Sequence, residues 1–336
     1  MPDITNVREI KGVDPGAIPD SLLCSTEPIV LRGLAADWPL VQAGRESAQA
    51  ASAYLQRFYR DATVQAWLGQ PQIEGRFFYN ETLDGFNFRP VRIRLDAVLD
   101  EIARHRHDEK PPAIYVGSTT VDTCLPGFRG ENDLGMGERQ PLVSVWLGNR
   151  SRIAAHHDLP DNLACVAVGH RRFTLFPPGE LDNLYVGPLD FTPAGQAISL
   201  VDFARPDFDR FPKFRNALRN AQVAELGPGD AVFIPSMWWH HIEALDALNV
   251  LVNYWWRQSP AYMDSPMNAL MLAIMSVRDL PAEQRTAWQN LFRHYVFEAG
   301  ESTASHIPPG ARRVLSPLDA DAARELRARL LSRLNR

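Results

Sequence analysis

Three residues of this 336-residue chain carry the side chains that could hold a metal ion: His156, Asp158 and His240. His156 and Asp158 are two residues apart, so on a β-strand their side chains share one face. His240 directly follows Trp238-Trp239, whose rings could wall a site and keep it dry. Two imidazoles and one carboxylate bind one face of a metal and leave the other open, as in non-haem Fe(II) oxygenases. The sequence therefore predicts a metal centre with these three ligands.

Two alternatives to this ligand set follow from the same residues. His241 is adjacent to His240 and could take its place, whereas His157 would point away from the metal. Zinc is the chemical rival of iron, but it usually takes three or four Cys or His ligands. The three cysteines lie far apart, at positions 24, 124 and 165, and offer no such spacing.

Composition and charge narrow the class of protein. A formal net charge of −5 and a pI near 6.0 give no indication that the protein binds nucleic acid or an anionic membrane. The cysteines are odd in number and lie far apart in the sequence, which favours a reducing, cytoplasmic location. Residues 1–15 hold no apolar signal core, and no apolar run reaches the length of a membrane span.

The middle of the chain reads as a series of short strands. Apolar runs separated by turn residues cover 113–116, 142–147, 163–168, 172–176, 231–234 and 250–255. Val168-Gly169-His170 predicts a tight hairpin turn. Many short strands at regular intervals indicate an antiparallel sandwich or barrel. The stretch 179–225 is a long insertion between strands, and such segments usually serve function, so we expect it to form one side of a substrate mouth.

Helices are expected on both sides of these strands. Apolar spacing predicts helices over 46–59 and 95–102, within a helical and strand elaboration that spans 1–111 and precedes a core over 112–260. Residues 261–336 form a helical C-terminal region with apolar stripes near 267–275 and 288–296, a linker over 301–315 and a short last helix. Because the chain already has a core, these stripes suggest a homodimer interface.

Several stretches together resemble the JmjC-type, cupin-like 2-oxoglutarate oxygenases, and within them the asparaginyl hydroxylases that modify hypoxia-inducible factor. They are His156 to Asn162, Gly169 to Pro178, Val201 to Pro212, Gly227 to Glu243, and Asn253 to Trp255. The resemblance implies a mostly β fold with flanking helices: a double-stranded β-helix, or jelly-roll, with a helical C-terminal extension.

The resemblance also implies cofactors and their residues. Fe(II) would be held by His156, Asp158 and His240, and 2-oxoglutarate and O2 would act as co-substrates. Tyr115 and Arg171 match family positions at the distal carboxylate of 2-oxoglutarate, although adjacent Arg172 could exchange roles with Arg171. Asn162 and Asn253 match residues near the iron and the 2-oxoglutarate. The family threonine three residues before the first ligand is Ile153 here, which removes one hydroxyl.

The expected reaction is hydroxylation of a C–H bond with release of succinate and CO2. The substrate could be a protein or peptide side chain or a small molecule. The family's Arg-Gln pair for substrate amides falls on Ala197 and Ile198, although Gln196 is near. Two alternatives stay open: a metal-binding cupin that needs no 2-oxoglutarate, and a non-catalytic binding or sensor module.

Overall fold

The computed structural model describes residues 4–335, so the first three residues of the predicted N-terminal elaboration and the last residue of the predicted tail lie outside it. The chain divides into two compact units, Met1–Gln258 and Ser259–Arg336. None of the helices in the described part of the chain is long and apolar enough to cross a membrane.

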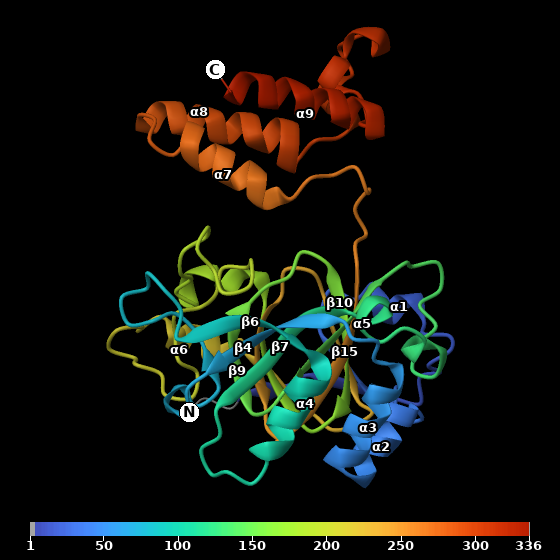
Figure 1. The fold of residues 1–336 in the computed structure, drawn as a ribbon. Helices are drawn as coiled ribbons and strands as arrows, with labels where there is room; N and C mark the ends of the chain where they lie inside the picture. The colour runs from blue at the N-terminus through green and yellow to red at the C-terminus, as the bar shows by residue number, and fades with distance from the viewer. Residues whose placement is uncertain (1–3, 336) are drawn as a thin grey trace. The chain divides into compact units, whose positions relative to one another are not determined.

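The first unit is built on two β-sheets (Figure 1). Within the described residues, one sheet has nine strands in the order β2-β3-β13-β10-β15-β8-β7-β4-β6, and the other has six in the order β1-β12-β11-β14-β9-β5. The strands are β1 Thr5–Asn6, β2 Arg8–Lys11, β3 Ile29–Arg32, β4 Thr63–Gly69, β5 Arg76–Phe77, β6 Phe88–Arg94, β7 Ala113–Thr120, β8 Leu142–Gly148, β9 Ser151–His156, β10 Asp161–Val168, β11 Arg171–Phe176, β12 Gln222–Leu226, β13 Ala231–Ile234, β14 Trp239–Ala244 and β15 Asn249–Trp256.

Strands β8 to β15 form the jelly-roll core. Four of them, in the order β13-β10-β15-β8, belong to the larger sheet, and the other four, in the order β12-β11-β14-β9, belong to the smaller one. Every neighbouring pair within these two sets is antiparallel. The chain therefore crosses repeatedly between the two sheets, and the predicted double-stranded β-helix is confirmed.

The central strand β10 shows how the layers are held together. Its odd-numbered side chains, such as Leu163 and Cys165, pack in the cluster that includes helices α2 (Pro39–Glu46), α3 (Ala48–Phe58) and α4 (Leu95–Arg104). Its even-numbered side chains, such as Ala164 and Val166, pack with β11 and β14 in a second cluster. Both faces of β10 are buried, which explains why its sequence is a continuous apolar run.

The N-terminal third of the chain extends the larger sheet. Strand β3 pairs with β13, and β4 pairs with both β7 and β6. Helices α3 and α4 lie where the apolar spacing predicts them. Strands β4 and β6 were not predicted from the sequence. Four of the seven residues of the edge strand β6 are Arg or Pro, so it has no apolar run. Short helices fill the connections: α1 Asp20–Leu23, η1 Pro71–Ile73, α5 Val121–Cys124 and η2 Phe128–Gly130.

The predicted hairpin at Gly169 is wrong. Strands β10 and β11 on either side of it belong to different sheets, so the turn carries the chain across the jelly-roll instead of pairing the two strands. Gly169 has φ +75°, and a Cβ there would lie 2.5 Å from the Asn249 side-chain oxygen. A tight crossing and a hairpin need the same turn residues, so local sequence could not distinguish them.

The insertion 179–225 is a packed lobe. It contains η3 (Pro178–Asn183), α6 (Phe214–Arg219) and β12. Leu184, Val201 and Phe214 of the insertion pack with Phe176 of β11 and Trp239 of β14. The lobe is therefore fixed to the two strands that also carry residues of the candidate site.

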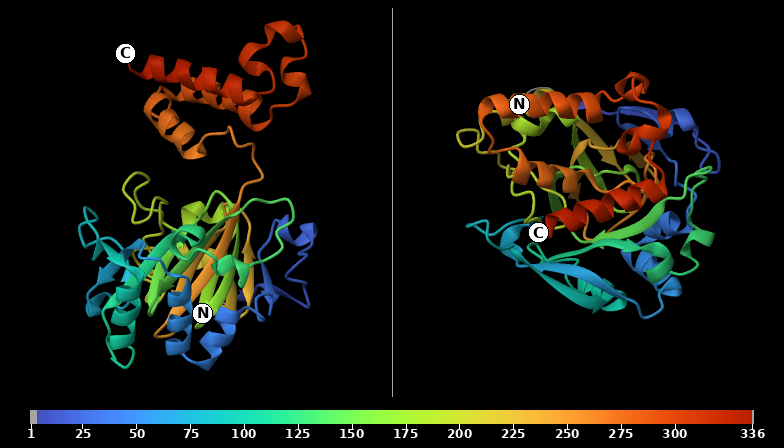
Figure 2. Two further views of the ribbon diagram at one scale, coloured as in Figure 1. Left: turned by 45° about the vertical axis from the view of Figure 1, so that its right-hand side comes forward. Right: turned by 90° about the horizontal axis from the view of Figure 1, so that it is seen from above.

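The second unit is helical, with α7 (Pro266–Ser276), α8 (Ala282–Phe292) and α9 (Ala320–Leu334) (Figures 1 and 2). The last helix has 15 residues and is longer than expected. The stretch expected to be a linker contains short helical turns. They are η5 Glu301–Ala304, η6 Pro309–Ala311 and η7 Arg313–Leu315. A further helical turn, η4 Arg293–Phe297, directly follows α8. The three α-helices bury none of their own residues.

Candidate metal centre

His156, Asp158 and His240 come together in the first unit. One potential ligand atom from each lies within 4.8 Å of the others. His156 is the last residue of β9, and His240 lies directly opposite it on β14. The expectation that the whole His156–Asp158 segment is strand is wrong, because Asp158 lies in the loop that follows β9. The Met237 N–H donates to the Asp158 carbonyl at 2.9 Å, so this loop is bound to the turn before β14.

Both histidine rings are oriented by their own backbones. His156 Nδ1 lies 2.9 Å from the Ala154 carbonyl oxygen, and His240 Nδ1 lies 3.0 Å from that of Trp238. A carbonyl oxygen can only accept, so each Nδ1 carries the proton and each Nε2 is left with a lone pair. Metal-binding histidines are commonly held in this way by a group outside the ligand set.

Burial keeps the site ready for a cation. His240 is 1% exposed, and burial lowers its pKa to about 4, so its ring is neutral at pH 7. The Asp158 carboxylate is also buried, and its Oδ2 lies 3.6 Å from His240 Nε2. Two imidazoles that each present Nε2 and one buried carboxylate form a donor set that suits a divalent metal.

The neighbouring histidines face elsewhere. His241 packs against Phe203 of the insertion, with ring centroids 4.6 Å apart, and both of its ring nitrogens are buried without a hydrogen-bond partner. His157 packs edge-on against Trp239. Strand alternation therefore decides between His240 and His241, and only His240 faces the ligand group.

β-Bulges bring further residues to the site. The register of the β9–β14 pair shifts between His240 and Ile242. His156 pairs with His240 and Ile153 pairs with Ile242, so β9 advances by three residues where β14 advances by two. On a regular strand, Ile153 and His156 would face opposite sides, but the extra residue lets both line the cavity. A second bulge in β7 does the same for Tyr115 and Ser118.

Arg171 is the buried cation of this cavity. It is 3% exposed, its Nε has no hydrogen-bond partner, and among residues 4–335 no carboxylate lies within salt-bridge distance. Burial lowers its pKa to about 10, which still leaves the guanidinium charged at pH 7. Arg172 instead points outward and forms an ion pair with Glu225 at 2.7 Å. The structure thus places Arg171, and not Arg172, at the cavity.

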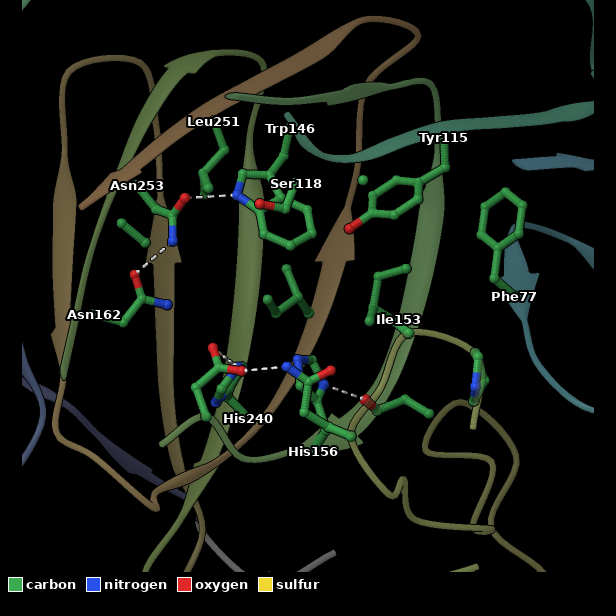
Figure 3. Close-up of a pocket in the computed structure, with 18 of the residues that line it drawn as sticks. Phe77, Tyr115, Ser118, Trp146, Ile153, His156, Asn162, His240, Leu251 and Asn253 are labelled. Atoms are coloured by element: carbon green, nitrogen blue, oxygen red, sulfur yellow. Dashed lines mark hydrogen bonds and ion pairs between the residues drawn. The ribbon is translucent and has the colours of Figure 1, made fainter. Parts of the chain in front are cut away.

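Tyr115 also faces the cavity (Figure 3). Its side chain is buried, and burial raises the pKa of its hydroxyl, so the phenol keeps its proton. A neutral phenol donates a hydrogen bond, and the Arg171 charge lies near enough to influence its titration. Ile153 lines the same space and provides no hydroxyl, whereas Ser118 does.

Asn162 and Asn253 form a buried chain of hydrogen bonds beside the ligand group (Figure 3). The Asn253 amide donates to the Asn162 side-chain oxygen at 3.2 Å, and the Asn253 oxygen accepts from Trp146 Nε1 at 2.7 Å. The three residues come from the neighbouring strands β10, β15 and β8. All seven residues predicted for the site therefore line one cavity.

The cavity encloses about 490 Å³ between the two sheets. Its walls also include Gln65 and Trp67 of β4, Phe77 of β5, and Pro193, Ala194, Gln196 and Ile198 of the insertion. Trp67, Trp146 and Ser118 were not predicted. Nothing in one sequence distinguishes a cavity aromatic from a core aromatic, and Ser118 faces the cavity because of the bulge in β7. From the sequence, Gln196 was noted only as a neighbour of the positions that hold the family's Arg-Gln pair. In the structure its side-chain amide donates to Asp158 Oδ1 at 2.9 Å.

The residues present fit Fe(II) and 2-oxoglutarate. The donor set has three protein ligands on one side and open cavity on the other, unlike the closed four-ligand sites of structural zinc. None of the three cysteines lines the cavity. The unpaired Arg171 supplies the positive charge that a carboxylate of 2-oxoglutarate needs, and Tyr115 supplies a hydroxyl donor.

Comparisons with known proteins agree with this geometry. The profile of a family described as a cupin-like domain matches residues 15–262. Lysine-specific demethylase JMJ31 of Arabidopsis thaliana is 30% identical over 167 residues, covering 47% of this chain and 28% of that protein. Lysine-specific demethylase 8 of Xenopus tropicalis is 28% identical over 240 residues, which cover 70% of this chain and 49% of that protein. HSPB1-associated protein 1 of Homo sapiens is 29% identical over 169 residues, which cover 49% of this chain and 32% of that protein.

The chain thus matches half or less of the length of each of these relatives. The family match, in contrast, covers most of this chain and contains all seven predicted site residues. The chain belongs to the cupin-like family of JmjC-type oxygenases.

Proposed function

We propose that this protein is an Fe(II)- and 2-oxoglutarate-dependent oxygenase that hydroxylates a C–H bond of its substrate. One observation carries the proposal: a His-Asp-His ligand group and a buried, unpaired arginine line the same cavity. When bound, iron and 2-oxoglutarate supply the oxidising power for attack on the C–H bond, with O2 consumed and succinate and CO2 released.

The protein's own residues position these groups. His156 and His240 would bind the metal through Nε2, since both Nδ1 atoms are directed at backbone carbonyls, and Asp158 would provide the anionic ligand. Arg171 and Tyr115 would hold the distal carboxylate of 2-oxoglutarate. The Asn162–Asn253 pair would fix polar groups beside the metal, and the aromatic walls would exclude water.

The cavity wall favours an uncharged substrate group. Apart from the ligand group and Arg171, no residue that lines the cavity carries a charge. Asp158 is the one carboxylate among the lining residues, and the metal would occupy it. Two relatives are named lysine-specific demethylases, but a methylated lysine keeps its positive charge and would find no acidic partner here. We therefore propose hydroxylation of a neutral group on a protein, a peptide or a small molecule.

A turnover assay tests the activity. The full chain is incubated with Fe(II), ascorbate and 2-oxoglutarate in air, and succinate is quantified against a His156→Ala control. We expect slow succinate formation that depends on iron and is absent from the variant. A cupin that does not use 2-oxoglutarate would bind Mn(II) but would neither bind 2-oxoglutarate nor form succinate. A non-catalytic module would form no succinate although the protein is folded.

We also propose that the second unit makes a homodimer. Its helices expose large apolar side chains, namely Met271, Met275, Trp288, Leu291, Leu331 and Leu334. Exposed apolar area of this kind usually marks an interface. Light scattering on the full chain should give twice the monomer mass, and Trp288→Glu with Leu331→Glu should give the monomer. A monomeric wild-type chain at micromolar concentration would contradict the proposal.

A further inference from the structure

Gln196 connects the insertion to the ligand group. Its side-chain amide donates to Asp158 Oδ1 at 2.9 Å. The backbone three residues further on is fixed, because the Ser199 N–H donates to the Ala155 carbonyl at 2.7 Å and Ser199 is fully buried. Ala155 directly precedes His156, so the segment that carries Gln196 runs beside the end of β9. The position of Gln196 is therefore built into the fold.

This contact makes the two oxygens of the Asp158 carboxylate different. Oδ1 accepts the hydrogen bond from Gln196, whereas Oδ2 lies 3.6 Å from His240 Nε2, on the side of the ligand group. Within residues 4–335, Gln196 is the one side chain that hydrogen-bonds to this carboxylate. A carboxylate can bind a metal through one oxygen or through both. Binding through both would use a position that a co-substrate or O2 needs.

We infer that Gln196 is a positioning residue, which holds Asp158 so that it ligates the metal through Oδ2 alone and keeps one more coordination position open. The inference rests on the proposed metal centre and adds a role that the ligand set by itself does not define. The side chain comes from the insertion, whose Pro193, Ala194 and Ile198 also line the cavity. The same segment therefore shapes the substrate wall and fixes a metal ligand.

Mn(II) binding to the full chain tests this role without turnover. Gln196→Leu keeps the size of the side chain but removes the donor, Gln196→Ala removes both, and Gln222→Leu, outside the cavity on β12, is the matched control. Free Mn(II) is measured by electron paramagnetic resonance, and exchangeable water on bound Mn(II) is measured by proton relaxation. Thermal melting identifies any variant that is not folded.

Both Gln196 variants should bind Mn(II) about tenfold more weakly, the low end of losses seen when a group that orients a ligand is removed. Bound Mn(II) should also carry about one exchangeable water fewer, because Asp158 can then ligate through both oxygens. Gln222→Leu should match the wild type. Wild-type affinity and relaxation in a folded Gln196 variant would overturn the role of Gln196. Failure of the wild-type chain to bind Mn(II) would instead contradict the metal centre itself.

Discussion

His240 on β14 lies directly opposite His156 on β9, with ring centroids 4.3 Å apart. The two residues are far apart in the sequence, and antiparallel pairing within the smaller sheet brings them together. Each Nδ1 is hydrogen-bonded to the carbonyl oxygen two residues earlier in the chain, Ala154 for His156 and Trp238 for His240. The sheet thus sets both the distance between the rings and the nitrogen that each presents.

Replacing His240 should abolish metal binding, whereas replacing its neighbour should not. His240→Ala removes one of three ligands, so Mn(II) affinity should fall at least about a hundredfold. His241→Phe should keep wild-type affinity, because His241 packs against Phe203 and its ring nitrogens have no partners to lose. Calorimetric titration with Mn(II) measures both variants. Loss of binding in a folded His241→Phe chain would show that the ligand had been assigned to the wrong histidine.

Arg171 and Arg172 should differ in their effect on 2-oxoglutarate. Arg171→Ala removes the buried cation of the cavity, so 2-oxoglutarate affinity of the Mn(II) form should fall at least about tenfold, from loss of a charge-assisted contact. Arg172→Ala breaks ion pairs with Glu225 and Glu243 on the outer face of β11. Such surface pairs contribute about 1 kcal/mol or less each to stability, so affinity should be unchanged. Equal losses in the two variants, measured by calorimetry at saturating Mn(II), would contradict the assignment.

Asn253 should matter for stability as well as for the site. Asn253→Ala leaves Trp146 Nε1 and the Asn162 oxygen without their partner, and Asn253 is 1% exposed. Unsatisfied buried polar groups cost about 1–3 kcal/mol each, so the free energy of unfolding should fall by about 2 kcal/mol or more. Asn216→Ala, on the exposed side of α6, is the control and should change it by less than about 0.5 kcal/mol. Urea unfolding followed by tryptophan fluorescence measures both, and similar small changes would show that the hydrogen-bond chain is not stabilising.

Much of the fold could be predicted from local patterns. The buried runs of β8, β10 and β15, the helices α3 and α4, and the metal residues all have clear signals in one sequence. The predictions that were wrong depend on which strands pair and where each strand ends. The turn at Gly169 has the composition of a hairpin but joins two sheets, and the strand continuing to Asp158 ends at His156. Sequence marks where a turn lies but not which strands it joins.

The same reason explains the gaps in the site. Strand alternation predicts that only one of Arg171 and Arg172 faces inward, but the choice needs the register of β11 between β12 and β14. Ile153 and Ser118 reach the cavity only through bulges, which reverse the expected alternation. Gln196 meets Asp158 across 38 residues, from a segment with no periodic pattern. Contacts of this kind depend on tertiary packing and leave no local trace.

A crystal structure of the full chain with Mn(II) and N-oxalylglycine, an analogue of 2-oxoglutarate, tests the central claim most directly. We predict one Mn(II) bound by His156 Nε2, His240 Nε2 and Asp158, with the distal carboxylate of the analogue on Arg171 and Tyr115. The claim would be contradicted by a metal at any other residues, or by an analogue whose distal carboxylate lies away from Arg171.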